Sequence, residues 1–411
     1  MAKPIALFVG KPFPLFISWL NEQGYEVHLF IEKNETRPIP SGVAAAYSID
    51  FSSERSIKDS LPHSIKNPQF LVNVYENSVP QKALLAQFFN VPGPSLEATH
   101  VATDKFEMRT AFAKHCPEYS PQFTLASTWE EIEQFLQKEN ITFPLILKPT
   151  NLFKSLLVTK CNSVAQLRAA FDEGMKRITA IYAKEKVSYP PRFVVEEFLD
   201  GPSYSMEVFV DADGNTVTAP TPVDLVMGRD IGIDDNYNYS RKLPTQLSEQ
   251  DQIAIKHAAI AGTKALGLTS SPAHVELVLT KNGPKLIEIG ARTGGYRQRM
   301  HWLSHGVDLF QAQVDVAQGK LPKLTQTKNA YCAVYEIFPE HEGTLQEITN
   351  LEKLKQLPTL YYLKQQIQPG QPTGPAKLGY RFALLAIFAS ANQKQFESDT
   401  TFFEQNVTVL T

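Results

Sequence analysis

Two apolar runs, each interrupted by one glutamate and separated by a short turn sequence, constrain this chain more than any other feature. The runs span 274–280, which contains Glu276, and 284–289, which contains Glu288. Such runs predict β-strands, in which successive side chains point to opposite faces. The residues expected on the core face are Val275, Leu277, Leu279, Ile287 and Ile289. Both glutamates are then expected on the other face of a β-hairpin.

The turn decides whether the two carboxylates meet. A two-residue Asn282-Gly283 turn would pair Glu288 with Leu277, whereas a three-residue loop over 281–283 with Gly283 left-handed would pair Glu276 with Glu288. We favour the loop because a one-residue slip moves every side chain to the wrong face. Opposed carboxylates repel, and Mg²⁺, which takes one or two carboxylates plus phosphate oxygens, would offset that repulsion. The alternative is an ordinary hairpin with a solvated outer face.

Length and composition set the broad class of the chain. Its 411 residues predict two to four domains, and 43% hydrophobic with 20% charged residues is typical of a globular protein. A net charge of −3 indicates neither a nucleic-acid surface nor a membrane contact, and we expect neither partner. No run reaches the roughly 18 apolar residues of a membrane span. Three scattered cysteines fit a reducing, cytoplasmic location.

The first part of the chain, residues 1–98, is expected to form an α/β domain with a parallel sheet. Short apolar runs alternate with helical patterns there, as in strand–helix–strand units. The expected strands are 5–9, 25–31 and 70–74, and the expected helices are 16–23 and 80–89.

Residues 99–199 and 200–328 are expected to form two further units, followed by a β-rich unit over 329–411. The second unit is predicted to contain helices at 103–114, at 128–137 behind a Thr128/Glu131 capping box, and after Ser163, with strands at 141–148, 156–159 and 192–199. The third is predicted to contain a strand at 204–210, a long loop at 220–238 near a site, a Ser248-capped helix and the hairpin. The last is predicted to contain strands at 330–338, 359–367 and 381–388.

Four motifs in order give the chain a resemblance to the ATP-grasp superfamily, and within it to the carboxylate–amine ligases. They are Thr-Asp-Lys-Phe at 103–106, Phe-Pro-Leu-Ile-Leu-Lys-Pro at 143–149, Val-Glu-Glu-Phe-Leu-Asp-Gly at 195–201, and the hairpin up to Gly295. His274 before Glu276, and the C-terminal tail, resemble the L-amino-acid ligase branch more than the purine-pathway branch. The resemblance implies an ATP-grasp fold of mixed α/β and α+β class. It would have an N-terminal Rossmann-like domain, a small lid subdomain (99–199), a large subdomain (200–328) and a small C-terminal β-rich domain.

The resemblance also implies a nucleotide site. Lys105 and Lys148 would bind ATP phosphates, Glu196 the adenine amino group, and the backbone of Glu197 and Leu199 the ring edge. The phosphate loop at 149–158 lacks the usual glycines, so Lys154 and Ser155 are expected to contact phosphate through their side chains. Ser203 stands where the resemblance places an acid for the ribose.

The resemblance further implies that Glu276 and Glu288 hold Mg²⁺, for which Mn²⁺ is an expected substitute. Gly290 stands where an Asn commonly completes the metal set, so we expect one firmly held ion and a second held weakly if at all. Arg292, together with Glu288, is the expected catalytic residue, since a guanidinium can grip a carboxylate and a transferring phosphoryl group. The expected substrate contacts are His274, for which a structural role is the alternative, Gly294, Gly295 and Tyr296. Arg297 and Arg299 could also read an acidic or amino-acid substrate.

The function that follows from the resemblance is ATP-dependent ligation of a small-molecule carboxylate to an amine, with an amino acid as the expected substrate. Two alternatives stay open. One is a weak or inactive ATP-binding module, and the other is a purine-pathway-type carboxylase or formyltransferase. A homodimer is a further expectation from relatives.

Overall fold

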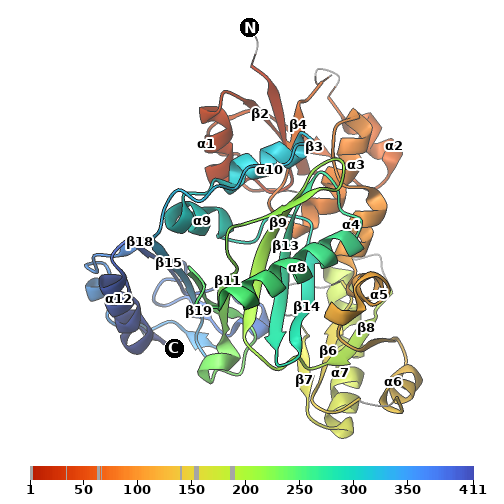
Figure 1. Cartoon of the computed structure of the whole chain (residues 1–411), viewed down its shortest axis with the longest axis vertical. Coiled ribbons are helices and arrows are strands. Elements are labelled where there is room, and N and C mark those ends of the chain that lie inside the picture. Colours follow the sequence, from red (N-terminus) through yellow and green to blue (C-terminus); the bar gives the residue numbers. More distant parts are fainter. Residues whose placement is uncertain are drawn as a thin grey trace.

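The N-terminal part of the chain forms a parallel four-stranded sheet, as the sequence predicted. The computed structural model describes residues 3–33, 35–62, 65, 67–138, 141–151, 157–185 and 190–411. The strand order is β3-β2-β1-β4, and every pair is parallel (Figure 1). The elements are β1 (Ile5–Val9), α1 (Pro14–Glu22), β2 (Glu26–Glu32), β3 (Val43–Ile49), α2 (Glu54–Ser60), β4 (Phe70–Val72), η1 (Glu76–Ser78) and α3 (Val79–Phe89). The sequence patterns missed β3 and α2, because β3 is rich in small residues and only partly buried.

Two helices, not one, lead out of this unit. They are α4 (Leu96–Thr103) and α5 (Lys105–His115), so the predicted single helix over 103–114 is wrong at its start. Asp104 separates them as the N-cap of α5, with Oδ1 accepting from the backbone N–H groups of Phe106 at 2.8 Å and Glu107 at 3.2 Å. The cap fixes where the helix begins and therefore where Lys105 points.

A small antiparallel sheet follows, in the order β5-β8-β6-β7. Its elements are η2 (Pro117–Tyr119), β5 (Phe123–Ala126), α6 (Trp129–Leu136), β6 (Leu145–Pro149), β7 (Thr159–Cys161), α7 (Val164–Glu185) and β8 (Phe193–Glu197). The Thr128/Glu131 capping box is confirmed. The strand predicted from 156 begins only at Thr159, and residue 156 lies outside the described residues.

The large sheet has the order β14-β13-β9-β11-β12-β15-β20-β18, with β10 paired to β9. Its elements are β9 (Ser203–Val210), β10 (Thr216–Thr218), β11 (Val223–Met227), η3 (Gly228–Ile231), β12 (Asn238–Leu243), α8 (Glu249–Ala265), β13 (Ser271–Thr280), β14 (Gly283–Gly290), α9 (Arg297–His305), α10 (Leu309–Ala317), β15 (Tyr331–Ile337), β18 (Leu360–Gln365) and β20 (Leu384–Ser390). The prediction of a long loop over 220–238 is therefore wrong in part, since the segment supplies β11 and η3.

The C-terminal strands extend the large sheet, because β12 pairs with β15. The remaining elements are β16 (Gly343–Thr344), β17 (Glu347–Ile348), α11 (Leu351–Leu354), β19 (Pro372–Thr373), η4 (Ala376–Leu378), α12 (Gln393–Asn406) and β21 (Val409–Leu410). Figure 1 shows α8 crossing β13 and β14, and α12 beside the C-terminal strands. The main core lies between α8, α5 and the inner face of the large sheet, and includes Val275, Leu277 and Leu286.

The hairpin pairs Glu276 with Glu288, as predicted, but reaches that register by a different route. Thr280 pairs with Gly283, so the turn is Lys281-Asn282 and the predicted three-residue loop is wrong. Gly283, at φ +100, is already in the strand. Leu277 then pairs with Leu286 while Glu276 pairs with Glu288, which leaves Ile287 as the extra residue of a β-bulge. The bulge turns Leu286 into the core and Ile287 toward a cavity, opposite to the face predicted for Ile287.

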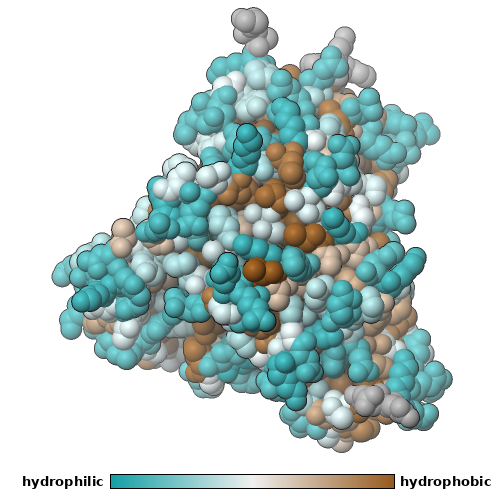
Figure 2. All heavy atoms as spheres, in the orientation of Figure 1, coloured by the Kyte–Doolittle hydropathy of each residue, from teal (hydrophilic) through white to brown (hydrophobic). Residues whose placement is uncertain are grey.

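One face of the molecule and the described helices can be compared with what a membrane-spanning segment requires. The face shown in Figure 2 is mostly hydrophilic, with apolar side chains in small separate groups. Within the described ranges, no helix is both long enough and apolar enough to cross a membrane.

Candidate active site

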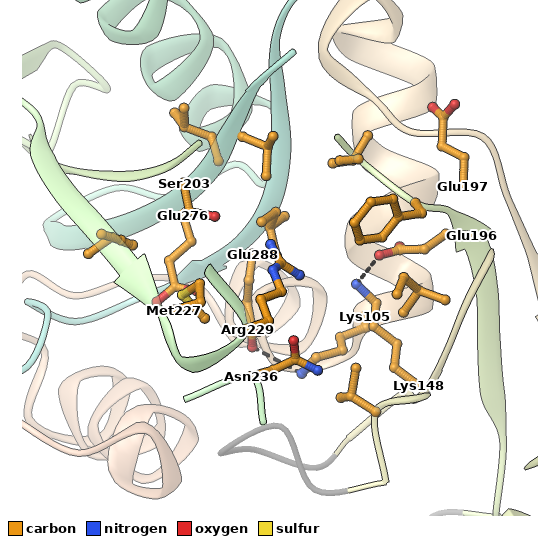
Figure 3. Close-up of a pocket in the computed structure, with 18 of the residues that line it drawn as sticks. Lys105, Lys148, Glu196, Glu197, Ser203, Met227, Arg229, Asn236, Glu276 and Glu288 are labelled. Atoms are coloured by element: carbon orange, nitrogen blue, oxygen red, sulfur yellow. Dashed lines mark hydrogen bonds and ion pairs between the residues drawn. The ribbon is translucent and has the colours of Figure 1, made fainter. Parts of the chain in front are cut away.

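A cavity lies where the small sheet faces the hairpin edge of the large sheet. Its walls come from β6 and β8 on one side and from β9, β11, β13 and β14 on the other (Figure 3). The charged side chains in its lining are Lys105, Lys148, Glu196, Glu197, Arg229, Glu276 and Glu288. The four sequence motifs, at 103–106, 143–149, 195–201 and in the hairpin, thus each contribute residues to one cavity.

The carboxylate pair on the hairpin has two neighbours. Lys105 Nζ lies 3.0 Å from Glu288 Oε1, and His274 Nε2 lies 3.3 Å from Glu276 Oε1. Burial alone would raise the pKa of Glu276, but the hydrogen bond and charge of His274, helped by Arg297 and Arg292, lower it to about 2. Glu276 is therefore ionised at neutral pH. Mg²⁺ prefers carboxylate oxygens, so the donor set fits this cation.

Glu276 and Glu288 together offer a metal ion two protein ligands. Among them, no group of three or more His, Cys, Asp or Glu side chains is arranged to hold a metal ion. Mg²⁺ commonly uses one or two carboxylates and fills its remaining positions with waters and phosphate oxygens. Two protein ligands are consistent with this coordination. Gly290 has no side chain and therefore cannot supply a third.

Lys148 belongs to a buried ion-pair triad with Glu196 and Arg109 that the sequence did not indicate. Arg109 Nε donates to Glu196 Oε2 at 2.8 Å, and Lys148 Nζ donates to Glu196 Oε1 at 2.5 Å. Burial and the Arg109 charge lower the pKa of Lys148 to about 8, whereas the two cations hold the pKa of Glu196 below its usual value against the effect of burial. Arg109 also donates to the carbonyl of Ile287, the bulge residue, at 2.5 Å. The triad therefore joins α5, β6, β8 and the hairpin.

The triad bears on the adenine contact that was predicted for Glu196. Both of its carboxylate oxygens are engaged by Arg109 and Lys148. The adenine contact predicted for Glu196 would need one of these interactions to change, and it stays a prediction. Figure 3 shows the Glu196 carboxylate turned toward Lys148 and that of Glu197 turned away.

The segment after β8 contains further residues that are predicted to contact the nucleotide. Glu197 Oε1 accepts from the backbone N–H of Gln122 at 3.0 Å, and the Glu197 N–H donates to the Gln122 carbonyl at 3.0 Å. Leu199 and Ser203 line the cavity, as does Phe198, whose ring lies 3.7 Å from Lys160 Nζ. The predicted phosphate contacts Lys154 and Ser155 lie outside the described residues.

His274 sits between two glutamates instead of facing open space. Its Nδ1 lies 2.5 Å from Glu207 Oε1, so both ring nitrogens are engaged and the buried ring is not free for substrate in this arrangement. Glu207 raises the pKa of His274, although burial acts in the opposite direction. Glu207 Oε2 also accepts from the Gly294 N–H at 3.0 Å. A Cβ on Gly294 would collide with the His274 ring, so Gly294 is required for packing there.

Tyr296 and Gly295 lead from the hairpin into α9. Tyr296 has φ 64, and its hydroxyl donates to Glu336 Oε1 on β15 at 2.9 Å. Burial and the Glu336 charge raise the pKa of Tyr296. Arg297 donates to the Ser205 hydroxyl at 2.9 Å and to the Gly295 carbonyl at 3.1 Å, which ties this loop to β9. Tyr296 is thus tied to the C-terminal strands, and its predicted substrate contact stays a prediction.

Arg292 pairs with a residue of the N-terminal unit. Its Nε lies 2.8 Å from Glu76 Oε2, and burial, which would lower the pKa of Arg292, is outweighed by Glu76 and three further carboxylates, Glu207, Glu276 and Glu288. The guanidinium therefore stays charged beside the carboxylate pair. Glu76, Arg109 and Glu207 are among the residues of this site that sequence reasoning missed, because nothing in their local sequence marks them.

Comparison with known proteins identifies the fold. Residues 141–299 match the family model described as an ATP-grasp domain. The alanine–anticapsin ligase of Bacillus subtilis strain 168 is 30% identical over 271 residues, which are 61% of this chain and 55% of that protein. The chain spans just over half the length of the first curated relatives it matches, namely 56% of a protein from Sinorhizobium fredii and 55% of an alanine–anticapsin ligase from Bacillus subtilis.

Solved structures extend the comparison to nearly the whole chain. The L-amino acid ligase from Bacillus licheniformis superposes with a TM-score of 0.81 at 19% identity, covering 99% of this chain and 98% of that one. The N5-carboxyaminoimidazole ribonucleotide synthetase from Thermotoga maritima gives 0.69 at 14% identity over 100% of both chains. The predicted mixed α/β ATP-grasp fold with its N-terminal parallel sheet is confirmed.

Proposed function

We propose that this chain, which has the ATP-grasp fold, is an ATP-dependent ligase that joins a small-molecule carboxylate to an amine. ATP, held with Mg²⁺, would supply a phosphoryl group to the carboxylate, and the amine would then displace phosphate from the acyl phosphate. The observation that carries the proposal is the pair of opposed carboxylates, Glu276 and Glu288, in the lining of a cavity that Lys105 and Lys148 also line.

Each group of residues in the site would have its own role in the reaction. Glu276 and Glu288 would hold the cation, since hard cations bind carboxylate oxygens. Lys105 and Lys148, which reach the cavity as compact positive charges, would bind the phosphates. The Glu197–Leu199 hinge and Ser203 would bind the nucleoside, and Arg292 would stabilise charge on the transferred phosphoryl group. Phosphoryl transfer needs this positioning and neutralisation more than it needs an acid or base.

The substrate class that we favour is an amino acid coupled to a second amino acid or a similar amine. Two similarities support that choice over a purine-pathway carboxylase or formyltransferase. The chain resembles an alanine–anticapsin ligase, and its TM-score is higher with an L-amino acid ligase (0.81) than with the N5-carboxyaminoimidazole ribonucleotide synthetase (0.69).

We further propose that Mn²⁺ substitutes for Mg²⁺ and that the four parts 1–98, 99–199, 200–328 and 329–411 fold as units. We also propose that the protein is a homodimer and that it acts in the cytoplasm, where its three buried free thiols would stay reduced.

A second candidate is an ATP-binding module without turnover. The glycine-free segment 149–158 favours it, because backbone amides wrap phosphates less freely without glycine. In addition, both lysines of the cavity are already paired with glutamates.

The test is ADP release from ATP and Mg²⁺ in the presence of a matrix of amino-acid pairs, with Glu288→Gln as the matched variant. We expect turnover with a subset of pairs and its loss in Glu288→Gln. ATP binding without turnover for any pair supports the inactive module. ADP release that depends on bicarbonate or formate supports the purine-type reaction instead.

A further inference from the structure

Glu76 reaches the catalytic hairpin from outside the matched ATP-grasp domain. It begins η1, which follows β4 of the N-terminal sheet after a short connection (residues 73–75), and its Oε2 lies 2.8 Å from Arg292 Nε. The two side chains are only 28% and 23% exposed, so the charges are partly shielded from solvent. No sequence motif of the N-terminal unit had pointed to a residue of the active site.

Gly290 provides the space that Glu76 occupies. A Cβ on Gly290 would lie 2.6 Å from Glu76 Oε2 and 3.4 Å from Arg292 Cζ. Gly290 is not among the positive-φ glycines, so its backbone conformation does not require glycine. The absence of a side chain at 290, where the resemblance had suggested an Asn, is thus explained by the approach of the Glu76 carboxylate.

The contact between Glu76 and Arg292 is a close ion pair that lacks an aligned hydrogen bond. Glu76 Oε2 is buried, yet within the described part of the chain it accepts no aligned hydrogen bond, and its contact with Arg292 is an ion pair by distance only. A buried polar atom without an aligned hydrogen-bond partner carries a cost in stability and calls for an explanation. Such groups gather at functional sites, where geometry matters more than stability.

We propose that Glu76 is a positioning residue for Arg292, and that Gly290 is the position that admits it. The carboxylate holds the guanidinium beside Glu276 and Glu288, so the N-terminal unit contributes directly to the geometry of the phosphoryl site. This inference rests on the proposed function in one respect, namely that Arg292 contacts the transferred phosphoryl group.

The geometric half of the proposal is tested by chemical unfolding of Gly290→Ala, Glu76→Ala and the double variant. Gly290→Ala is expected to destabilise the protein because its Cβ displaces the Glu76 carboxylate. In the Glu76→Ala background the same substitution should cost much less stability, since the colliding oxygen is gone. Effects that simply add in the double variant overturn the proposal.

The functional half is tested by titrating inorganic phosphate into protein saturated with MgADP, which needs no knowledge of the substrate. Glu76→Gln is expected to bind phosphate about 10- to 100-fold more weakly than the unchanged protein, with its MgADP affinity preserved. Glu54→Gln is the matched control, because Glu54 is an exposed acid of the same unit, paired with Lys58 at 2.8 Å. It should leave phosphate binding unchanged.

Equal phosphate affinities in the unchanged protein and Glu76→Gln, including no measurable binding by either, overturn the positioning role. A failure of the proposed ligase function would appear elsewhere, as absence of ADP release with every amino-acid pair. The two failures are therefore distinguishable.

Discussion

Lys105 and Glu288 meet across 183 residues of sequence, with Nζ 3.0 Å from Oε1. The lysine comes from the first turn of α5 and the glutamate from β14. In this arrangement the ammonium neutralises one of two opposed carboxylates, which is the electrostatic task that a divalent cation would perform. Lys105 and the proposed cation would therefore act on the same carboxylate, and these charge contacts would have to change if nucleotide and metal bind.

Replacing that lysine should make the carboxylate pair more dependent on metal. In Lys105→Met, Glu288 loses its ion pair, and repulsion from Glu276 is left without that compensation. We expect a lower unfolding midpoint without metal and a larger rise in that midpoint on adding Mg²⁺ than in the unchanged protein. Thermal unfolding with and without Mg²⁺ measures both, and an equal Mg²⁺ response in the two proteins would contradict the link.

Replacing Arg109 should be strongly destabilising. Arg109→Met leaves Glu196 buried with one cation fewer and removes a donor to the Ile287 carbonyl. Breaking a buried pair costs about 3–5 kcal/mol of unfolding free energy, because a charge is left uncompensated. Denaturant unfolding measures the loss. The control is Arg168→Met, whose exposed pair with Asp172 at 3.0 Å should be worth about 1 kcal/mol or less.

The low pKa of Glu276 should appear in the pH dependence of stability. A folded-state pKa of about 2, below the ordinary value of 4.5, means that folding favours the ionised form. The stabilisation is present above pH 4.5 and is lost as the pH falls from there toward about 2. We expect Glu276→Gln to flatten the fall in unfolding free energy over that range. Identical pH profiles for the two proteins would show that Glu276 is not held ionised by its neighbours.

The two adjacent glycines after the hairpin should differ in their tolerance of a methyl group. Gly294→Ala would drive a Cβ into the His274 ring, which is held between Glu207 and Glu276, and should lower the unfolding midpoint and disturb Glu276. A Cβ on Gly295 meets nothing within 4 Å, so Gly295→Ala should leave the midpoint nearly unchanged. Thermal unfolding of both variants is the measurement. Comparable losses in the two variants would count against the packing role of Gly294.

Local sequence patterns located many elements to within a few residues but not their connections at the site. β1 begins and ends at the same residues as the apolar run 5–9, and the predicted capping box of Thr128 and Glu131 is present. The alternation of the hairpin predicted that Glu276 and Glu288 are opposed, yet the structure reaches this pairing through a two-residue turn and a bulge at Ile287. A bulge is favoured by packing on both faces of the hairpin, so the period-2 pattern alone could not reveal it.

The amino-acid sequence alone predicted the type of many elements, the opposed carboxylates and the likeness to a fold, because propensity, alternation and capping act between near neighbours. The packing of the folded chain brings Arg109 and Lys148 to Glu196, places His274 between Glu207 and Glu276, and puts Glu76 in the space beside Gly290. Each of these contacts joins segments that are distant in the chain. Long-range ion pairs depend on how whole units pack, and their partners leave no periodic signal in the sequence around them.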